Sequence, residues 1–279
     1  MHPLLTQYIW QIAESYLPEL FLHLRQRRDP QSQVLPKAYD AVVQASGQAK
    51  GWNDYLTAVH SPDKSVLVLP VSGAMSREGY WNFGNAFFVR QLNAALKDDQ
   101  YRGAVLSMHT PGGTVDSTPE FAQAVAAFRA AKPITVATAY CASAGYYVAS
   151  QADEIHMEDQ AVSSVGSIGV LMIYENWKKH LEQEGIHMEY MRATKSKDKG
   201  LVNWIEDLPE EARAELQDLL DACQAEFEGA VKRGRAGKIV SEEVFTGKMY
   251  GTSQAIKLGL VDRKGNLQTA VKRVLELSK

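Results

Sequence analysis

Residues 134–151, ITVATAYCASAGYYVASQ, change character abruptly, and this change constrains the fold more than any other feature of the chain. A β-branched apolar run leads into the small residues 141–145, and helix-compatible residues follow. The pattern predicts a strand, then a tight turn of small residues, then a helix with Ser143 at its N-terminus. Unpaired backbone N–H groups gather there, so Ser143 suits either a helix N-cap or a nucleophile whose oxyanion those groups receive.

A second strand–turn–helix unit precedes this one. The apolar run at 103–108 ends at Pro111-Gly112-Gly113, and Thr118-Pro119 then begins a helical pattern. Two glycines after a strand let the backbone approach a ligand closely, although a plain turn explains them equally well. Two consecutive units of this kind predict an α/β fold, with the special residues at the carboxyl edge of the sheet, where ligands bind in such folds.

A serine nucleophile needs a base, and the sequence does not offer an obvious one. Of the seven histidines, only His109 adjoins a candidate site residue. Position 141 is cysteine, so no GxSxG motif surrounds Ser143, and we interpret Cys141 as a small buried residue. A buried lysine could serve instead, and the segment MRATKSKDKG offers three candidates: Lys195, Lys197 and Lys199.

Ordered motifs along the chain resemble a known family. They are VLVLPVSGAM at 66–75, TPGG at 110–113, CASAGYYVAS at 141–150, SSVGSIGVLM at 163–172, KSKDKG at 195–200, LPEEAR at 208–213 and FTGKMYGTSQAIKLGLVD at 245–262. Together they resemble the serine peptidases typified by signal peptide peptidase A and the phage capsid (prohead) proteases. The resemblance covers roughly residues 64–275.

This resemblance implies a site and a fold. It places Ser143 as nucleophile, Lys197 as general base, and Gly113 with Ala144 as oxyanion-hole donors, with Gly112 beside them. It implies a Clp-protease/crotonase-like spiral of ββα units. The family's usual Gly-Asn/Ser-Pro tail after the lysine loop is absent, since residues 200–204 read GLVNW, so Lys195 and Lys199 remain alternatives.

The resemblance also implies how the site is completed. The ordinary pKa of lysine, about 10.4, leaves the amine protonated at neutral pH, so the base must be desolvated. A short loop cannot enclose it, and in the family a neighbouring subunit or second domain does so. We therefore expect a homo-oligomer with active sites completed between subunits, a protein or peptide substrate, and no cofactor or metal.

Composition and charge add bounds to these expectations. The net charge of −3 and the lack of a basic stripe give no reason to expect nucleic acid. No run approaches the roughly 20 apolar residues of a membrane span, so none is expected in this chain. An amphipathic pattern over residues 4–24 predicts a helical N-terminal extension at 1–62, with linkers at 31–36 and 60–64, before a peptidase domain at 63–279.

Alternating patterns predict the elements of the peptidase domain. Strands are expected near 66–71, 103–108, 134–140, 153–157 and 186–191, and helices near 83–97, 118–130, 144–151, 174–184, 209–233 and 266–276.

Three functions fit these features. The first is a capsid maturation protease that cleaves scaffold or head proteins in the host cytoplasm or the assembling phage capsid. The second is a cellular peptidase that degrades signal-peptide remnants. The third is a capsid-assembly scaffold that has lost catalysis. A crotonase-like acyl-CoA enzyme shares the oxyanion geometry without needing a serine.

Overall fold

A parallel β-sheet forms the centre of the computed structural model, which describes residues 10–12, 56–57, 59–79 and 83–279. Its main path runs in the order β2-β3-β5-β6-β9, and all of these neighbours are parallel. The strands are β2 (Val66–Ser72), β3 (Gly103–Thr110), β5 (Ile134–Ala142), β6 (Glu154–Met157) and β9 (Arg263–Lys264). The end of β5 also pairs with β7 (Ser164–Gly166), which pairs in turn with β8 (Met249–Tyr250). The sheet and its helices confirm the predicted α/β class.

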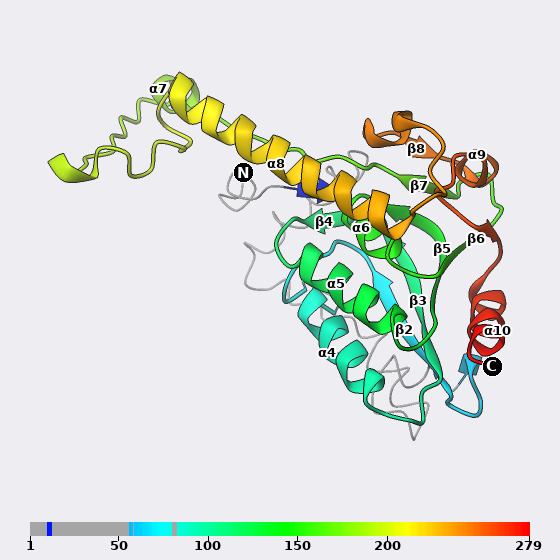
Figure 1. Ribbon diagram of the computed structural model, residues 1–279. Helices are drawn as coiled ribbons and strands as arrows, with labels where there is room; N and C mark the ends of the chain where they lie inside the picture. Colours follow the sequence, from blue (N-terminus) through cyan, green and yellow to red (C-terminus); the bar gives the residue numbers. More distant parts are fainter. Residues whose placement is uncertain (1–9, 13–55, 58, 80–82) are drawn as a thin grey trace.

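Helices cover both faces of the sheet (Figure 1). The alternation of side chains along β2 explains this, because Leu67, Leu69 and Val71 belong to one apolar cluster and Val66 and Val68 to another. The first cluster includes α4 (Asn85–Leu96) and α5 (Thr118–Arg129), and the second includes α10 (Leu267–Leu277). Burial on both faces makes β2 and β3 nearly continuous apolar runs.

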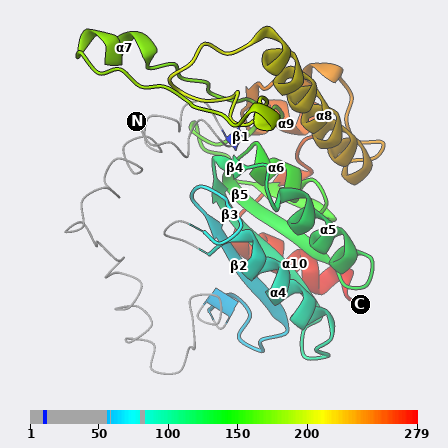
Figure 2. The same ribbon diagram turned by 90° about the vertical axis from the view of Figure 1, so that its left-hand side faces the viewer.

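An arm projects from this layered body (Figures 1 and 2). It contains α7 (Lys178–Gln183), the 3₁₀ turn η3 (Thr194–Ser196) and the first part of the 25-residue helix α8 (Glu210–Gly234). Apolar side chains lie exposed along the arm: Ile186, Met188, Tyr190, Met191, Val202 and Leu219. Among the described residues, no helix is both long enough and apolar enough to cross a membrane.

The C-terminal part of α8 is firmly attached to the body. Phe227 of α8 stacks on Tyr147 with ring centroids 4.9 Å apart, and Tyr147 belongs to α6 (Ala144–Ala149). Just beyond α8, the buried guanidinium of Arg235 pairs with Asp262 at 2.6 Å. Because α8 packs directly on α6, the arm is joined to the helix that begins after Ser143.

Several predicted elements differ from the structure. The strand predicted at 186–191 is wrong, because this segment lies in the arm without a sheet neighbour among the described residues. The helix predicted at 174–184 is confirmed only over 178–183.

The N-terminal prediction is largely untested. Most of the predicted helix at 4–24, and the linker at 31–36, lie outside the described residues, but residues 10–12 form strand β1 (Trp10–Ile12) instead of helix. The linker predicted at 60–64 contains a turn in which Ser61 is buried and its hydroxyl accepts the N–H of Val66. The described part of this segment is therefore tied to β2.

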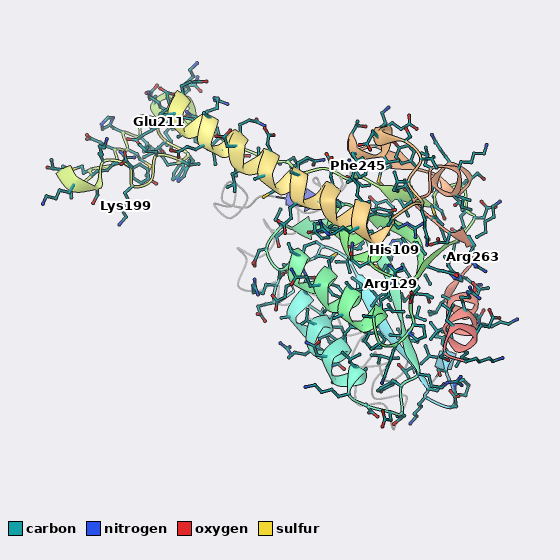
Figure 3. All side chains as sticks on the ribbon, in the orientation of Figure 1. His109, Arg129, Lys199, Glu211, Phe245 and Arg263 are labelled. Carbon is teal, nitrogen blue, oxygen red and sulfur yellow. The ribbon has the colours of Figure 1, made fainter. Side chains whose placement is uncertain are left out.

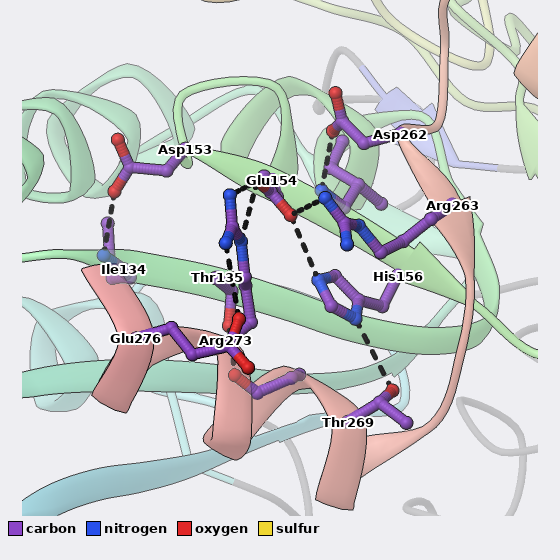
Figure 4. A network of polar contacts seen from close by, with 12 residues as sticks. Ile134, Thr135, Asp153, Glu154, His156, Asp262, Arg263, Thr269, Arg273 and Glu276 are labelled. Atoms are coloured by element: carbon purple, nitrogen blue, oxygen red, sulfur yellow. Dashed lines mark hydrogen bonds and ion pairs between the residues drawn. The ribbon is translucent and has the colours of Figure 1, made fainter.

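A partly buried polar network joins β6 to α10 (Figure 4). Glu154 accepts hydrogen bonds from Arg273 at 2.8 and 2.9 Å and pairs with Arg263 at 2.9 Å. His156 Nε2 lies 3.4 Å from Glu154 Oε2, the oxygen that pairs with Arg263. His156 Nδ1 lies 3.3 Å from the Thr269 hydroxyl. Burial lowers the pKa of His156, and this outweighs the nearby Glu154 carboxylate, which acts to raise it.

The pKa of His156 predicts a pH dependence of stability. Below the ordinary histidine pKa of about 6.5, the unfolded chain takes up a proton that folded His156 still excludes. Stability should therefore fall as the pH drops from 7 toward the lowered folded pKa, by up to about 1.4 kcal/mol per pH unit for one proton. Urea unfolding between pH 7.5 and 5.5 measures this slope. We expect a shallower slope in His156→Gln than in the wild-type chain; equal slopes in the two proteins would contradict the assignment.

Candidate active site

The turn after β3 brings two glycines to the carboxyl edge of the sheet. Thr110, the last residue of β3, donates to the carbonyl of Gly73 at 2.7 Å and accepts the N–H of Gly112 at 3.1 Å. Gly112 has a φ of 94°, which a residue with a side chain rarely adopts. The chain then enters the short strand β4 (Gly112–Thr114).

One edge of β4 is held by the segment after β2. Met75 N–H donates to the carbonyl of Gly112 at 2.8 Å, and Thr114 N–H donates to the carbonyl of Met75 at 3.0 Å. A Cβ added at Gly113 would lie 1.9 Å from the Met75 oxygen. Gly113 is therefore required for this close approach of two backbones.

Ser143 occupies a strained turn between β5 and α6. Its φ of 54° and ψ of −120° are rare for a residue with a side chain, and such strain persists where surrounding structure enforces it. Ser143 N–H donates to the carbonyl of Gly166 at 2.8 Å. Gly166 itself has a φ of 130°, and a Cβ there would lie 2.4 Å from the Lys248 oxygen. Gly166, the first of the two glycines in the segment SSVGSIG, thus helps to fix the Ser143 turn.

The two turns lie side by side. Cys141 of β5 pairs in register with Thr110 of β3, so the residues that follow each of them leave the same edge of the sheet. The first turn of α6 presses against Thr110, because a Cβ added at Gly145 would lie 2.5 Å from the Thr110 methyl group. The structure therefore brings Ser143 and Ala144 into the same region as Gly112 and Gly113.

Backbone donors are available at this point. The first hydrogen bond into α6 runs from Tyr147 N–H to the carbonyl of Ser143. The N–H groups of Ala144, Gly145 and Tyr146 consequently have no acceptor within the helix, as at the start of any α-helix. The Ser143 hydroxyl is buried and makes a long contact of 3.4 Å to the carbonyl of Gly169.

Neither Cys141 nor His109 is arranged to act on a substrate with Ser143. Cys141 is fully buried, and burial raises the pKa of its thiol far above the ordinary value, so the thiol stays protonated at neutral pH. His109 is exposed, and its ring lies 5.8 Å from that of Tyr140. Because neighbouring side chains of a strand alternate, His109 lies on the opposite face from Thr110, whose side chain contacts α6.

Lys197 lies on the arm, away from Ser143. Figure 3 labels Lys199 at the far tip of the arm and His109 in the body, and Lys197 is two residues from Lys199. The Lys197 side chain is 84% exposed, and its amine lies 3.9 Å from Asp198. A single chain therefore brings together Ser143, Ala144, Gly112 and Gly113, but not Lys197.

A groove of about 690 Å³ lies next to the candidate nucleophile. Gly169, whose carbonyl contacts the Ser143 hydroxyl, lines it. The remaining lining comes from the segment after β7, from α8 and from the loop before β8: Ser167, Val170, Leu171, Met172, Gln217, Leu220, Asp221, Gln224, Glu228, Phe245, Thr246 and Gly247. Its size suits several side chains of a peptide.

Sequence reasoning missed β1 and β4. The structure pairs β1 antiparallel with β4, with Gln11 opposite Gly113. The apolar residues in 4–24 recur at helical spacing, which predicts a helix and not a strand. Strands of only three residues are also too short to show the alternation of a strand.

Comparison with known proteins identifies the family. The model described as peptidase family S49 matches residues 126–279, more than half of the chain, and the chain belongs to this family. This membership agrees with the resemblance predicted from the motifs.

Relatives support a peptidase as the general class. The chain is 30% identical to capsid assembly protease C of Escherichia phage lambda, over 74% of this chain and 48% of that protein. It is 29% identical to a Methanocaldococcus jannaschii protein that carries a provisional protease name, over 69% of this chain and 61% of that one. The chain thus spans only about half to three fifths of the length of these relatives.

One solved structure with similarity to this chain is a lysine-to-alanine mutant of a membrane-bound stomatin-specific protease in complex with a substrate peptide. The two are 15% identical with a TM-score of 0.39, over 75% of this chain and 78% of that one.

Proposed function

We propose that this S49 family member is a serine endopeptidase. Ser143 is the nucleophile, the N–H groups of Gly113 and Ala144 hold the oxyanion, and Gly112 turns the chain so that Gly113 reaches the site. The observation that carries the proposal is the strained Ser143 at the start of α6, beside the glycine strand β4. Strained backbone beside helix N-terminal N–H groups that have no acceptor within the helix is typical of a nucleophile and its oxyanion hole.

The general base is Lys197 from a neighbouring copy of the chain. A lysine base must be desolvated so that its pKa falls toward neutrality, whereas the Lys197 side chain is 84% exposed here. The apolar side chains along the same arm include Met191, which is 91% exposed. Packing this arm against a second copy would bury both the apolar surface and the lysine.

The reaction proceeds in two stages. Neutral Lys197 takes the proton of the Ser143 hydroxyl while its oxygen attacks the scissile carbonyl carbon, and the carbonyl oxygen becomes an anion facing Gly113 and Ala144. The C–N bond then breaks as the lysine ammonium gives its proton to the leaving amine, which leaves an ester on Ser143. Water, deprotonated by Lys197, attacks this ester and releases the acid and the free hydroxyl.

Head proteins of an assembling phage capsid are the proposed substrates. The similarity to capsid assembly protease C of phage lambda supports this choice. Leu171, Met172 and Leu220 in the groove favour small or apolar side chains near the scissile bond. A head-protein precursor incubated with the assembled enzyme should be cut; cleavage of signal peptides with the precursor left intact would favour the cellular role.

A fluorophosphonate probe tests the catalytic assignment. We expect the wild-type chain to gain the mass of one probe and Ser143→Ala to gain none. Ser117→Ala is the matched control, because Ser117 is also buried with a positive φ of 67° but lies at the start of α5. Ser117→Ala should be labelled like wild type. Equal labelling of Ser143→Ala would remove Ser143 from the mechanism, and a folded, assembled wild type that takes no label would favour the inactive scaffold.

A further inference from the structure

Strand β4 has only one edge along which another strand can lie. Its other edge is used by Met75, which accepts the N–H of Thr114 and donates to the carbonyl of Gly112. Successive backbone groups of a strand point to opposite edges, so the N–H and carbonyl of Gly113 point away from Met75. A peptide whose carbonyl must reach the Gly113 N–H therefore has to lie along this second edge.

In this structure the second edge is occupied by the chain's own β1. The pairing is antiparallel, with Trp10 opposite Thr114, Gln11 opposite Gly113 and Ile12 opposite Gly112 (Figure 2). The N–H of Gly113 thus faces residue 11. A substrate strand on the same edge would compete with β1 for the same backbone groups.

We propose that β1 is a built-in competitor of the substrate, which restrains the peptidase until β1 leaves β4. The inference rests on the proposed function, because it takes Gly113 as an oxyanion donor. It adds that residues 10–12 act as a pseudosubstrate strand and that substrates bind as a strand antiparallel to β4. Because a competing segment lowers the fraction of binding-competent enzyme, it raises the apparent KM without changing the chemical step.

Two variants at one position test the proposal in the full-length chain. Gln11→Pro removes the backbone N–H of residue 11 and so disrupts pairing with Gly113. Gln11→Ala removes the same side chain but keeps the N–H, and is the matched control. Kinetics with a peptide substrate should show kcat/KM raised about threefold or more in Gln11→Pro, through KM, and unchanged in Gln11→Ala.

Amide hydrogen exchange gives a readout that does not depend on catalysis. Gly112 N–H is held by Thr110 and Thr114 N–H by Met75, whereas Gly113 N–H faces β1 and no other segment among the described residues. Exchange at Gly113 alone should therefore accelerate in Gln11→Pro, while its two neighbours stay protected. An added peptide of residues 6–16, TQYIWQIAESY, should slow exchange at Gly113 again and inhibit Gln11→Pro competitively.

The outcomes separate this proposal from the peptidase itself. Unchanged exchange at Gly113 and unchanged KM in Gln11→Pro would overturn it while leaving the peptidase intact. Faster exchange with lower kcat/KM would also overturn it, since β1 would then support the oxyanion strand instead of blocking it. If no variant cleaves any peptide, yet exchange at Gly113 rises and the added peptide reverses it, the reversible pairing of β1 with β4 is confirmed. The peptidase proposal then fails, and the restraint by β1 fails with it.

Discussion

Lys197→Ala is expected to lower kcat by about 10²- to 10⁴-fold, the usual contribution of a positioned general base. The fold should be retained, because the side chain is 84% exposed and its amine is 3.9 Å from the nearest carboxylate. Lys195→Ala and Lys199→Ala are the matched controls on the same loop and should keep wild-type rates. Loss of activity in either control, with Lys197→Ala unaffected, would assign the base to that lysine instead.

Mixing two inactive variants tests where the lysine comes from. If the base is supplied by a neighbouring copy, Lys197→Ala chains can be completed by the lysine of Ser143→Ala chains. An equimolar mixture assembled from dissociated chains should then recover about a quarter of the wild-type activity, because about a quarter of sites combine an intact serine with an intact lysine. A mixture that stays as inactive as its components would mean that serine and lysine come from the same chain.

Gly113→Ala should reduce kcat by about 10²- to 10³-fold, as expected when an oxyanion donor is displaced. The added Cβ would lie 1.9 Å from the Met75 oxygen, so β4 has to move away from Met75 and carry the Gly113 N–H out of position. Steady-state peptide hydrolysis measures the loss, and far-ultraviolet circular dichroism confirms that the fold is kept.

Gly251→Ala provides the control for this effect. Gly251 has a φ of −69°, and its added Cβ would meet only the Ser163 oxygen, at 3.9 Å, so alanine fits there. This variant should retain wild-type activity. Gly113→Ala with activity within a few-fold of Gly251→Ala would show that Gly113 does not serve the oxyanion.

The strands and helices of the body could be predicted because local pattern and tertiary environment agree there. β2, β3 and β5 are buried on both faces, so their apolar runs stand out, and Thr118-Pro119 marks the start of α5. The proximity of Ser143 to the glycine turn could also be predicted from the sequence, since consecutive parallel strands bring their carboxyl ends to one edge of the sheet.

The arm and the N-terminal strand could not be predicted in this way. The apolar residues at 186–191 have the spacing that predicts a strand. In the structure they lie exposed on the surface of the arm and pair with no strand among the described residues. β1 forms because β4, a segment about a hundred residues further along the chain, offers an edge on which it can pair. The local sequence of residues 10–12 does not reveal this edge. The strained conformation of Ser143 likewise depends on another strand, because the Ser143 N–H donates to the carbonyl of Gly166 in β7.

The decisive measurement is the separation between the Ser143 oxygen and the nearest lysine nitrogen in a structure of the assembled complex. We predict that Lys197 of one copy lies within hydrogen-bonding reach, about 3 Å, of Ser143 in another. A complex in which no lysine from any copy approaches Ser143 would contradict it.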